Sequence, residues 1–154
     1  MPTVSPVIAF TKHLTVDNPP GDVFEALADM DVLHRWNPNV RTSRRISGDR
    51  FGLGSKYESI IARGPLRMTA RSELVEVEMG RKVVYEGSIA WFWSVDSLTF
   101  EASGGGTRVT FRNETKTPRW LRPLIPLLNA SFQRQARRAV DGAARYLTER
   151  SSGW

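Results

Sequence analysis

The sequence has 154 residues, of which 40% are apolar and 25% are charged, and its formal net charge is +6. These values are typical of one soluble globular domain, which at this length buries about 70% of its unfolded surface. The absence of cysteine excludes disulfides and thiolate chemistry, and with only two histidines a histidine-rich metal site is not expected. We therefore predict neither a metal ion nor a cofactor.

The positive charge is carried mostly by arginine, which favours anionic partners in general. However, the arginines are spread from Arg35 to Arg150, and no run of Lys or Arg exceeds two residues. This pattern indicates a solvated surface, so we do not expect a nucleic-acid partner. The first ten residues do not resemble a signal peptide, and no window reaches the ~20 apolar residues of a membrane span. We expect a cytoplasmic protein without stable membrane insertion.

The first third of the chain predicts one strand followed by two short helices. Residues 8–16 alternate apolar and polar side chains, as a half-buried strand does. Residues 17–30 begin with polar capping residues and two prolines, which suit the first turn of a helix. Residues 31–37 form a second short helix, which ends before Pro38 because the residue preceding proline avoids helical geometry.

The middle of the chain, residues 40–116, predicts about six strands. Its apolar residues alternate with polar ones, and short turns join the runs, which favours an antiparallel meander. In the run from Leu66 to Glu78 the parity of the apolar residues switches at Val75. This switch indicates a β-bulge or a bend.

The last third predicts a long amphipathic helix after a proline-broken segment. Apolar side chains recur at intervals of three or four, at Leu128, Phe132, Ala136, Ala139, Ala143 and Leu147. Because packing supplies most of a helix's stability in water, this face needs the sheet as its partner. The predicted fold class is α+β: a curved antiparallel sheet of about seven strands, with the C-terminal helix across its concave face.

Three segments also carry a resemblance to a known family. They are VDNPPGDVFEALADMDVLHRWNPNV after the first strand, the strand pair LTFEASGGGTRVTF, and the closing amphipathic helix. The more specific pieces are Pro20 with Val23 and Phe24, Trp36 with Pro38, and the run Gly106–Thr110. Together they resemble the START-like superfamily, the helix-grip fold also called SRPBCC, in its polyketide cyclase/dehydrase-like branch.

The resemblance covers essentially the whole chain and implies a single domain over residues 1–154. Residues 118–150 would be the C-terminal helix region and residues 151–154 a disordered tail. It also implies a deep cavity between sheet and helix that holds a small hydrophobic molecule. Members of the superfamily include lipid carriers, hormone receptors, aromatase/cyclases and chaperone co-activators, so the fold alone does not determine the function.

Strand alternation predicts which side chains face this cavity. If Leu98 and Phe100 face the helix, every second residue before them does so too. The predicted lining side chains are Tyr57, Met68, Ser72, Tyr85, Phe92, Ser94, Asp96, Phe111, Asn113, Phe132 and Gln135. Mostly apolar walls with a few polar groups are typical of a small-molecule pocket. We expect the pocket to be wide near Phe132 and closed near Ala143.

Asp96 is the candidate catalytic residue. A carboxylate facing an apolar cavity has a raised pKa and can act as a general acid or base. In a cyclase it would move a proton during aldol closure and dehydration, with Tyr85 or Tyr57 orienting the substrate oxygen. The alternative is that Asp96 meets water or an arginine near the end of a strand.

Two apolar segments leave alternatives open. Regular alternation places Trp91 and Trp93 on the convex face, where they would form a surface for a homodimer or another protein. A bulge would instead turn them into the cavity. The stretch Trp120–Leu128, beside Arg119 and Arg122, is interpreted as a lid over the cavity or as a segment that touches a membrane. The lid is favoured, since proline-broken apolar segments pack well against a domain edge.

Three functional hypotheses follow from the sequence. The first is binding of a small hydrophobic or amphipathic molecule (a polyketide, a lipid or an aromatic compound). The second is a cofactor-independent enzyme of the polyketide cyclase/dehydratase type that uses Asp96. The third is a protein-interaction module that uses Trp91 and Trp93.

Overall fold

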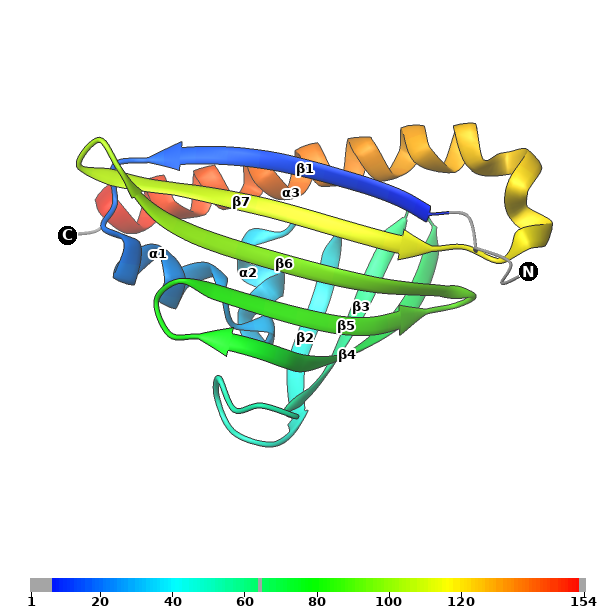
Figure 1. The fold of residues 1–154 in the computed structure, drawn as a ribbon, viewed down its shortest axis with the longest axis horizontal. Helices are drawn as coiled ribbons and strands as arrows, with labels where there is room; N and C mark the ends of the chain where they lie inside the picture. The colour runs from blue at the N-terminus through cyan, green and yellow to red at the C-terminus, as the bar shows by residue number, and fades with distance from the viewer. Residues whose placement is uncertain (1–6, 64, 153–154) are drawn as a thin grey trace, which may run out of the picture.

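The structure is a computed structural model that describes residues 7–63 and 65–152. It consists mainly of one antiparallel sheet and a long C-terminal helix (Figure 1). The strands are β1 (Val7–Val16), β2 (Val40–Ser47), β3 (Lys56–Arg63), β4 (Leu66–Glu78), β5 (Lys82–Ile89), β6 (Phe92–Ser103) and β7 (Gly106–Lys116). The helices are α1 (Pro20–Leu27), the 3-10 helix η1 (Met30–Val32), α2 (Leu33–Trp36), the 3-10 helix η2 (Arg119–Leu124) and α3 (Ile125–Ser152).

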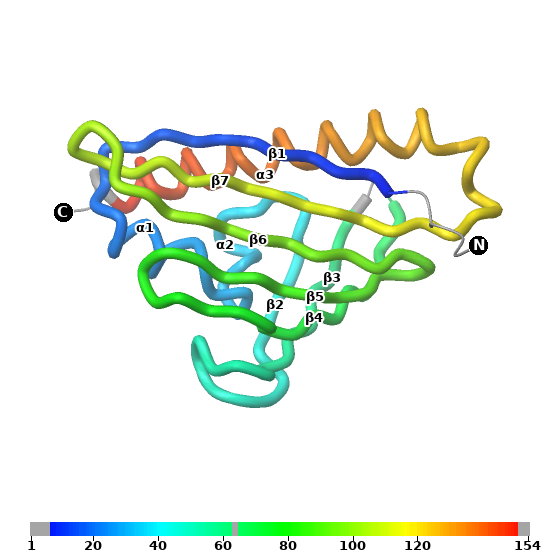
Figure 2. The backbone as a smooth tube through the Cα atoms, in the orientation of Figure 1, coloured from blue at the N-terminus to red at the C-terminus, as the bar shows by residue number. Residues whose placement is uncertain are grey.

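The strand order across the sheet is β1-β7-β6-β5-β4-β3-β2, and neighbouring strands are antiparallel. Strands β2 to β7 form a meander, and β1 pairs with β7 at the other edge (Figure 2). The short helices occupy the connection between β1 and β2. The register of β4 against β5 shifts between Leu74 and Glu76, where the sequence predicts a bulge at Val75. The predicted α+β helix-grip architecture is confirmed.

Helix α3 runs along most of the length of the molecule and packs against β1 and α2 (Figure 1). It begins at Ile125, directly after η2, with Pro126 in the first turn, where a missing N–H is tolerated. The helix continues through Ser152, so the expected disordered tail is wrong for residues 151 and 152. The last two residues of that expected tail, 153 and 154, lie outside the described residues.

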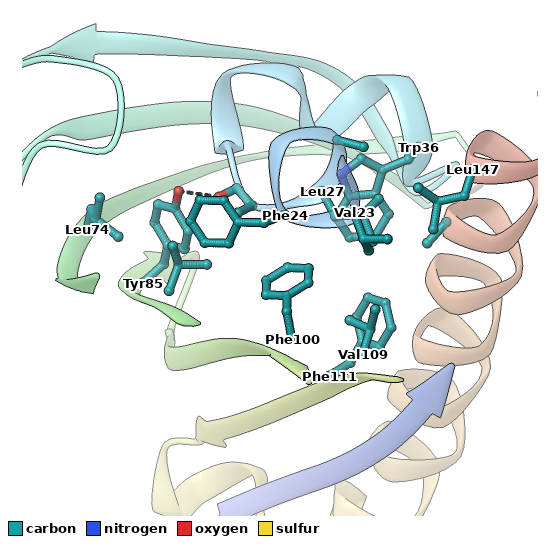
Figure 3. Packing of buried hydrophobic residues seen from close by; sticks show 14 of the residues in the cluster. Val23, Phe24, Leu27, Trp36, Leu74, Tyr85, Phe100, Val109, Phe111 and Leu147 are labelled. Carbon is teal, nitrogen blue, oxygen red and sulfur yellow. Dashed lines mark hydrogen bonds between the residues drawn. The ribbon is translucent and has the colours of Figure 1, made fainter. Parts of the chain in front are cut away.

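The hydrophobic core lies at one end of the molecule, under α1 (Figure 3). Val23, Phe24 and Leu27 of α1 are almost completely buried there, against Phe100 of β6. The rings of Phe24 and Phe100 meet edge to face, with centroids 5.3 Å apart. Leu147, in the last turns of α3, completes this packed end and is 1% exposed.

A glycine sets the closest approach between α3 and α2. A Cβ atom on Gly142 would lie 2.1 Å from the carbonyl oxygen of Trp36 and 2.7 Å from Cδ of Pro38. No side chain fits at such distances, because carbon and oxygen atoms repel below about 3 Å. Gly142 therefore lets α3 contact the end of α2 directly.

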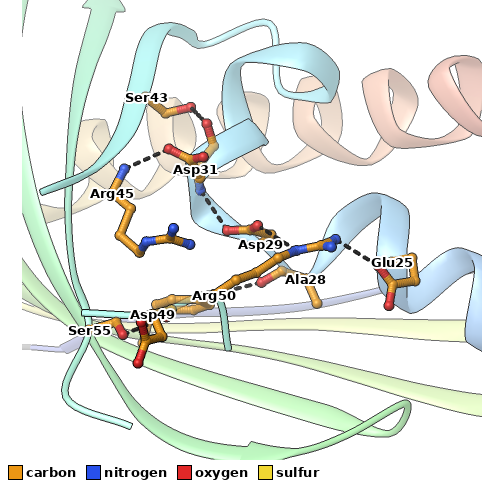
Figure 4. A network of polar contacts seen from close by, with 10 residues as sticks. Glu25, Ala28, Asp29, Asp31, Ser43, Arg45, Asp49, Arg50 and Ser55 are labelled. Atoms are coloured by element: carbon orange, nitrogen blue, oxygen red, sulfur yellow. Dashed lines mark hydrogen bonds and ion pairs between the residues drawn. The ribbon is translucent and has the colours of Figure 1, made fainter. Parts of the chain in front are cut away.

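A polar network ties the loop between β2 and β3 to the first helices (Figure 4). The guanidinium of Arg50 contacts Asp29 at 3.1 Å and Glu25 at 2.6 Å. The backbone N–H of Arg45 donates to the carboxylate of Asp31 at 2.6 Å. Asp29 is buried, and pairing with Arg50 offsets the free-energy penalty of burying its charge. The network therefore holds α1 and η1 over the sheet.

Candidate functional site

A cavity of about 270 Å³ lies between the concave face of the sheet, α2 and the first half of α3. Its wall contains residues from all seven strands, together with residues from α1, η1, α2 and α3. Among the wall residues from the helices are Leu27, Met30, Leu33, Trp36, Phe132, Gln135, Ala136, Ala139 and Val140. Most of the wall is apolar, and the polar residues that interrupt it include Ser94 and Asp96 of β6 and Asn113 and Thr115 of β7.

Ten of the eleven residues predicted to line the cavity are in its wall. They are Met68, Ser72, Tyr85, Phe92, Ser94, Asp96, Phe111, Asn113, Phe132 and Gln135. Alternation along a strand succeeds here because the register between β5 and β6 is continuous, so that every second side chain stays on one face. That these residues bind a ligand remains a prediction.

Tyr57 is the exception and is corrected by the structure. It is completely buried in the core and is not part of the cavity wall. Its ring meets that of Tyr85 edge to face at 5.5 Å, and burial raises the pKa of its hydroxyl. Tyr57 lies on the predicted face of the sheet, but the strand alternation gives no information about how deeply the neighbouring helices cover it.

Tyr85 reaches the cavity wall, but its hydroxyl has a structural partner. The hydroxyl donates a hydrogen bond of 2.6 Å to the backbone carbonyl of Ala28, the residue that ends α1. Burial, and next the neighbouring Tyr57, raise the pKa of Tyr85, so it stays a neutral donor. Tyr85 therefore satisfies an otherwise unpaired helix carbonyl, and its hydroxyl is not poised to orient a substrate oxygen.

Asp96 lies in the cavity wall within a short hydrogen-bonded chain. The side-chain amide of Asn113 donates to Oδ1 of Asp96 at 2.5 Å, and the hydroxyl of Thr115 donates to Oδ1 of Asn113 at 2.6 Å. Asp96 and Asn113 are direct partners across β6 and β7, which fixes this arrangement through the backbone register. The expected alternative was contact with water or an arginine: no arginine of the described residues forms an ion pair with Asp96, and contact with water stays a prediction.

The surroundings of Asp96 favour its neutral form. Burial raises the pKa of its carboxyl above the ordinary value, and the hydrogen bond from Asn113 opposes this increase only in part. Among the described residues no cation forms an ion pair with it. The protein therefore holds one carboxyl against an apolar cavity with a proton affinity higher than usual, which is the property required of a general acid.

The part of the wall that comes from α1, η1 and α2 was not predicted from the sequence. Leu27, Met30, Leu33 and Trp36 belong to this part. Their helical spacing shows that they face inward, but only the tertiary placement of the short helices shows that they reach the cavity. Asn39 was missed as well: its amide donates to the backbone carbonyl of Gln135 at 2.9 Å and so fixes α3 beside the cavity.

The cavity extends to Phe132 and ends before Ala143, which is the predicted direction. Phe132 lies in the wall and meets Phe92 edge to face, with ring centroids 5.8 Å apart. The wall follows α3 as far as Val140 and stops before Ala143, which is fully buried in the core. Phe132 therefore does not point into bulk solvent. A solvent-exposed Phe132 would have excluded the predicted cavity.

Trp91 and Trp93 do not enter the cavity. Trp93 is on β6 between Phe92 and Ser94, both of which line the cavity, so its own side chain lies on the opposite, convex face. Trp91 belongs to the turn between β5 and β6 and is exposed. Trp93 therefore lies on the convex face as regular alternation predicts, whereas Trp91 lies in the turn, and no bulge interrupts the pairing of β5 with β6. That the two tryptophans form an interface stays a prediction.

The interpretation of residues 120–128 as a lid is not supported. None of the residues in this stretch lines the cavity. Leu121 is buried, whereas Trp120, Leu124 and Leu127 point into solvent. The segment forms η2 and the start of α3, at the end of the molecule opposite α1 (Figure 1).

The site contains no obvious place for a metal ion. Within the residues that the structure describes, no group of three or more His, Asp or Glu side chains comes together. The polar groups of the cavity, Asp96, Asn113 and Thr115, supply one carboxylate and neutral oxygens. Such a set can orient or protonate an organic molecule directly.

A curved sheet that grips a long helix around an apolar cavity defines the helix-grip class of proteins. The family model described as "Polyketide cyclase / dehydrase and lipid transport" matches residues 7–148. The chain belongs to this family. A search of curated proteins found no match.

Solved structures share the fold at low sequence identity. The protein TTHA0849 from Thermus thermophilus is similar with a TM-score of 0.75 and 14% identity, covering 95% of this chain and 99% of that one. The di-domain aromatase/cyclase StfQ of the steffimycin biosynthetic pathway is similar with a TM-score of 0.73 and 18% identity, covering 95% of this chain and 52% of that one. Ms6760 from Mycobacterium smegmatis is similar with a TM-score of 0.68 and 19% identity, covering 96% and 99%.

Proposed function

We propose that the protein binds a small hydrophobic or amphipathic molecule in the cavity between its sheet and α3. The observation that carries this proposal is a largely apolar cavity whose wall includes the hydrogen-bonded pair of Asp96 and Asn113 on β6 and β7. Such a distribution lets the apolar walls supply affinity while the polar pair selects an oxygen or nitrogen of the ligand. Membership of a family described by cyclases and lipid transport supports the same ligand class.

The size of the cavity narrows the ligand further. Pockets for small molecules generally enclose about 300–1,000 Å³, and this one, at about 270 Å³, lies near the lower limit. Phe92, Phe111 and Phe132 present aromatic rings to it, and aromatic rings pack well edge to face or offset against other rings. A compact aromatic or polyketide-derived molecule therefore fits the site better than a lipid with two acyl chains.

A pair of neighbouring variants tests ligand binding in the cavity. Ala70→Phe adds a ring on the cavity side of β4, whereas Thr69→Phe adds the same ring at an exposed position one residue away. We expect N-phenyl-1-naphthylamine, a neutral fluorescent probe, to bind wild type and Thr69→Phe equally and to bind Ala70→Phe at least tenfold more weakly. Equal binding by all three proteins would place the ligand elsewhere.

A second candidate function is acid catalysis by Asp96, in a cyclisation followed by loss of water. The raised pKa of the carboxyl favours it, because a carboxylic acid that holds its proton more strongly than usual can protonate a carbonyl or a departing hydroxyl oxygen. The ionised carboxylate that remains would then take a proton from the adjacent carbon. Asn113 would hold the carboxyl in a fixed direction through both steps.

Thioester mimics of a linear poly-β-ketone, analysed by mass spectrometry for loss of one water, test this activity. Asp96→Asn should lower the rate by ~100-fold or more, the usual contribution of a positioned acid. The variant should keep its affinity for the neutral probe, because Asn has the same shape as Asp. A full rate with Asp96→Asn would reject the catalytic role and leave the binding function intact.

A further inference from the structure

The corner where β7 continues into η2 and α3 exposes large apolar side chains. Trp120 is 62% exposed, Leu127 is 68% exposed, and Leu124 between them also points into solvent. Trp91 from the turn between β5 and β6 packs edge to face on Trp120, with ring centroids 5.4 Å apart. We call these four residues the tryptophan corner. Contiguous exposed apolar groups of this size mark interaction surfaces rather than ordinary solvent-facing positions.

The same corner lies on the segment that carries the net charge of the whole protein. Residues 115–140 include no Asp or Glu and six basic residues, which are Lys116, Arg119, Arg122, Arg134, Arg137 and Arg138. Since the chain has 22 basic and 16 acidic residues, the remainder holds 16 of each and is neutral. All six side chains are exposed, and in the described part of the chain none of them forms an ion pair.

The tryptophan corner also lies next to the end of the cavity that Phe92 and Phe132 line. Trp91 and Phe92 are consecutive residues, and each meets an aromatic ring from the segment that follows β7. Phe92 contacts Phe132 in the cavity wall, while Trp91 contacts Trp120 on the outside. The exposed apolar surface is thus separated from the cavity by one pair of rings.

We propose that the tryptophan corner docks reversibly on a membrane surface that contains anionic lipids. Tryptophan prefers the level of the lipid headgroups, where its ring is in an apolar layer and its N–H in a wet one. Leu124 and Leu127 would enter the outer part of the acyl region, and the surrounding arginines would contact lipid phosphates. Docking is peripheral, since no helix in the described part of the chain is long and apolar enough to cross a membrane.

Two other partners fit the corner less well. A second copy of the chain, docked through the same surface, would bring Arg119 and Arg122 of one copy against those of the other, and like charges repel at short distance. A nucleic acid would contact the arginines but would leave Leu124 and Leu127 without an apolar partner. An anionic bilayer satisfies both the charge and the apolar side chains. This inference does not depend on which molecule the cavity binds.

Co-sedimentation of the full chain with vesicles tests the proposal. We expect the protein to bind vesicles of phosphatidylcholine and phosphatidylglycerol at least tenfold more tightly than vesicles of phosphatidylcholine alone, and to be released by high salt. Arg119→Gln combined with Arg122→Gln should weaken binding at least tenfold. The matched control, Arg81→Gln with Arg108→Gln, changes exposed arginines near turns at the opposite end and should bind like wild type (Figure 1).

A second pair of variants separates the apolar contribution from the charge. Leu127→Gln removes an apolar side chain that is 68% exposed on a helix, so the fold is retained, and it should reduce binding severalfold. Leu53→Gln, 69% exposed in the loop between β2 and β3, should have no effect. Failure of wild type to bind anionic vesicles at low salt would overturn the proposal. So would a dimer, seen by analytical ultracentrifugation, that Leu127→Gln dissociates, because the corner would then serve a second copy.

Discussion

The two ends of α3 differ in how closely they are packed. At its C-terminal end, Ala143 and Leu147 are fully buried against α1 and the sheet, and Gly142 lets the helix contact α2 directly. At its N-terminal end, Phe132 faces a cavity, and the residues before it are mostly in solvent. The same helix is therefore a core element at one end and a cavity wall at the other.

The difference shows how one fold separates stability from binding. Protein interiors are close-packed, so the free energy of folding depends on the end where small and large side chains interlock. The hollow end keeps apolar surface free for a ligand, and its residues contribute less to stability because part of their surface has no protein partner. The predictions below test this division, beginning with the largest expected effect.

The strongest test truncates one side chain at each end. Leu147→Ala should lower the free energy of unfolding by about 3 kcal/mol, the usual result for a fully buried leucine. Phe132→Ala should lower it by only about 1 kcal/mol, since it removes mainly the ring contact with Phe92. Urea denaturation of both variants measures the difference. Equal losses would mean that the two ends are equally packed.

The close approach of α3 to α2 gives the next largest effect. Gly142→Val places carbon atoms against the Trp36 carbonyl and should destabilise the protein by about 2 kcal/mol. Ala130→Val, an exposed substitution on the same helix, controls for the lower helix propensity of valine. Thermal denaturation of the two variants compares them. A stable Gly142→Val protein would show that α3 can move away from α2 without loss.

Asp96 should make the stability of the hollow end depend on pH. Its folded-state pKa is raised by burial, so the native state is favoured fully below the unfolded pKa of about 3.9 and loses stability as the pH rises through the folded pKa. Asp96→Asn removes this loss and should be more stable than wild type at pH 7, by on the order of 1 kcal/mol.

The comparison of the two proteins across pH is the decisive measurement. Their unfolding free energies should converge near pH 3, where the carboxyl is protonated in both the native and unfolded states. A constant difference from pH 3 to pH 8 would show that the change comes from altered packing or hydrogen bonding, and not from the proton equilibrium of the carboxyl.

The smallest effects are expected from ion pairs. Arg50→Gln breaks contacts with Asp29, which is buried, and with Glu25, and should cost about 1 kcal/mol or less. Arg112→Gln breaks a pair with Glu114 between exposed side chains and should have no measurable effect. Urea denaturation at low and high salt distinguishes them. A larger loss for Arg112→Gln than for Arg50→Gln would contradict the structural role of the polar network.

Much of the cavity wall follows from local sequence patterns, and the exceptions share a cause. Alternation identifies which side of a strand a residue occupies, so Met68, Phe92 and Asn113 are correctly placed in the wall. It gives no depth along the sheet, and for that reason Tyr57 was assigned to the cavity although it is completely buried in the core. The contribution of α2 to the wall was not predicted, because its position depends on contacts with elements distant in the sequence.

Local sequence patterns alone predict the order of the elements, the bulge near Val75 and the apolar face of α3. Each of these features depends on the spacing of residues within a few turns of helix or within one strand. The pairing of Asp96 with Asn113 and the packing of Trp91 on Trp120 are visible only in the tertiary structure. Those contacts join residues on different elements, and they depend on sheet curvature and strand register. The periodicity of the sequence indicates which face of a helix or strand a side chain occupies. The function depends on which of these faces pack against one another in the folded protein.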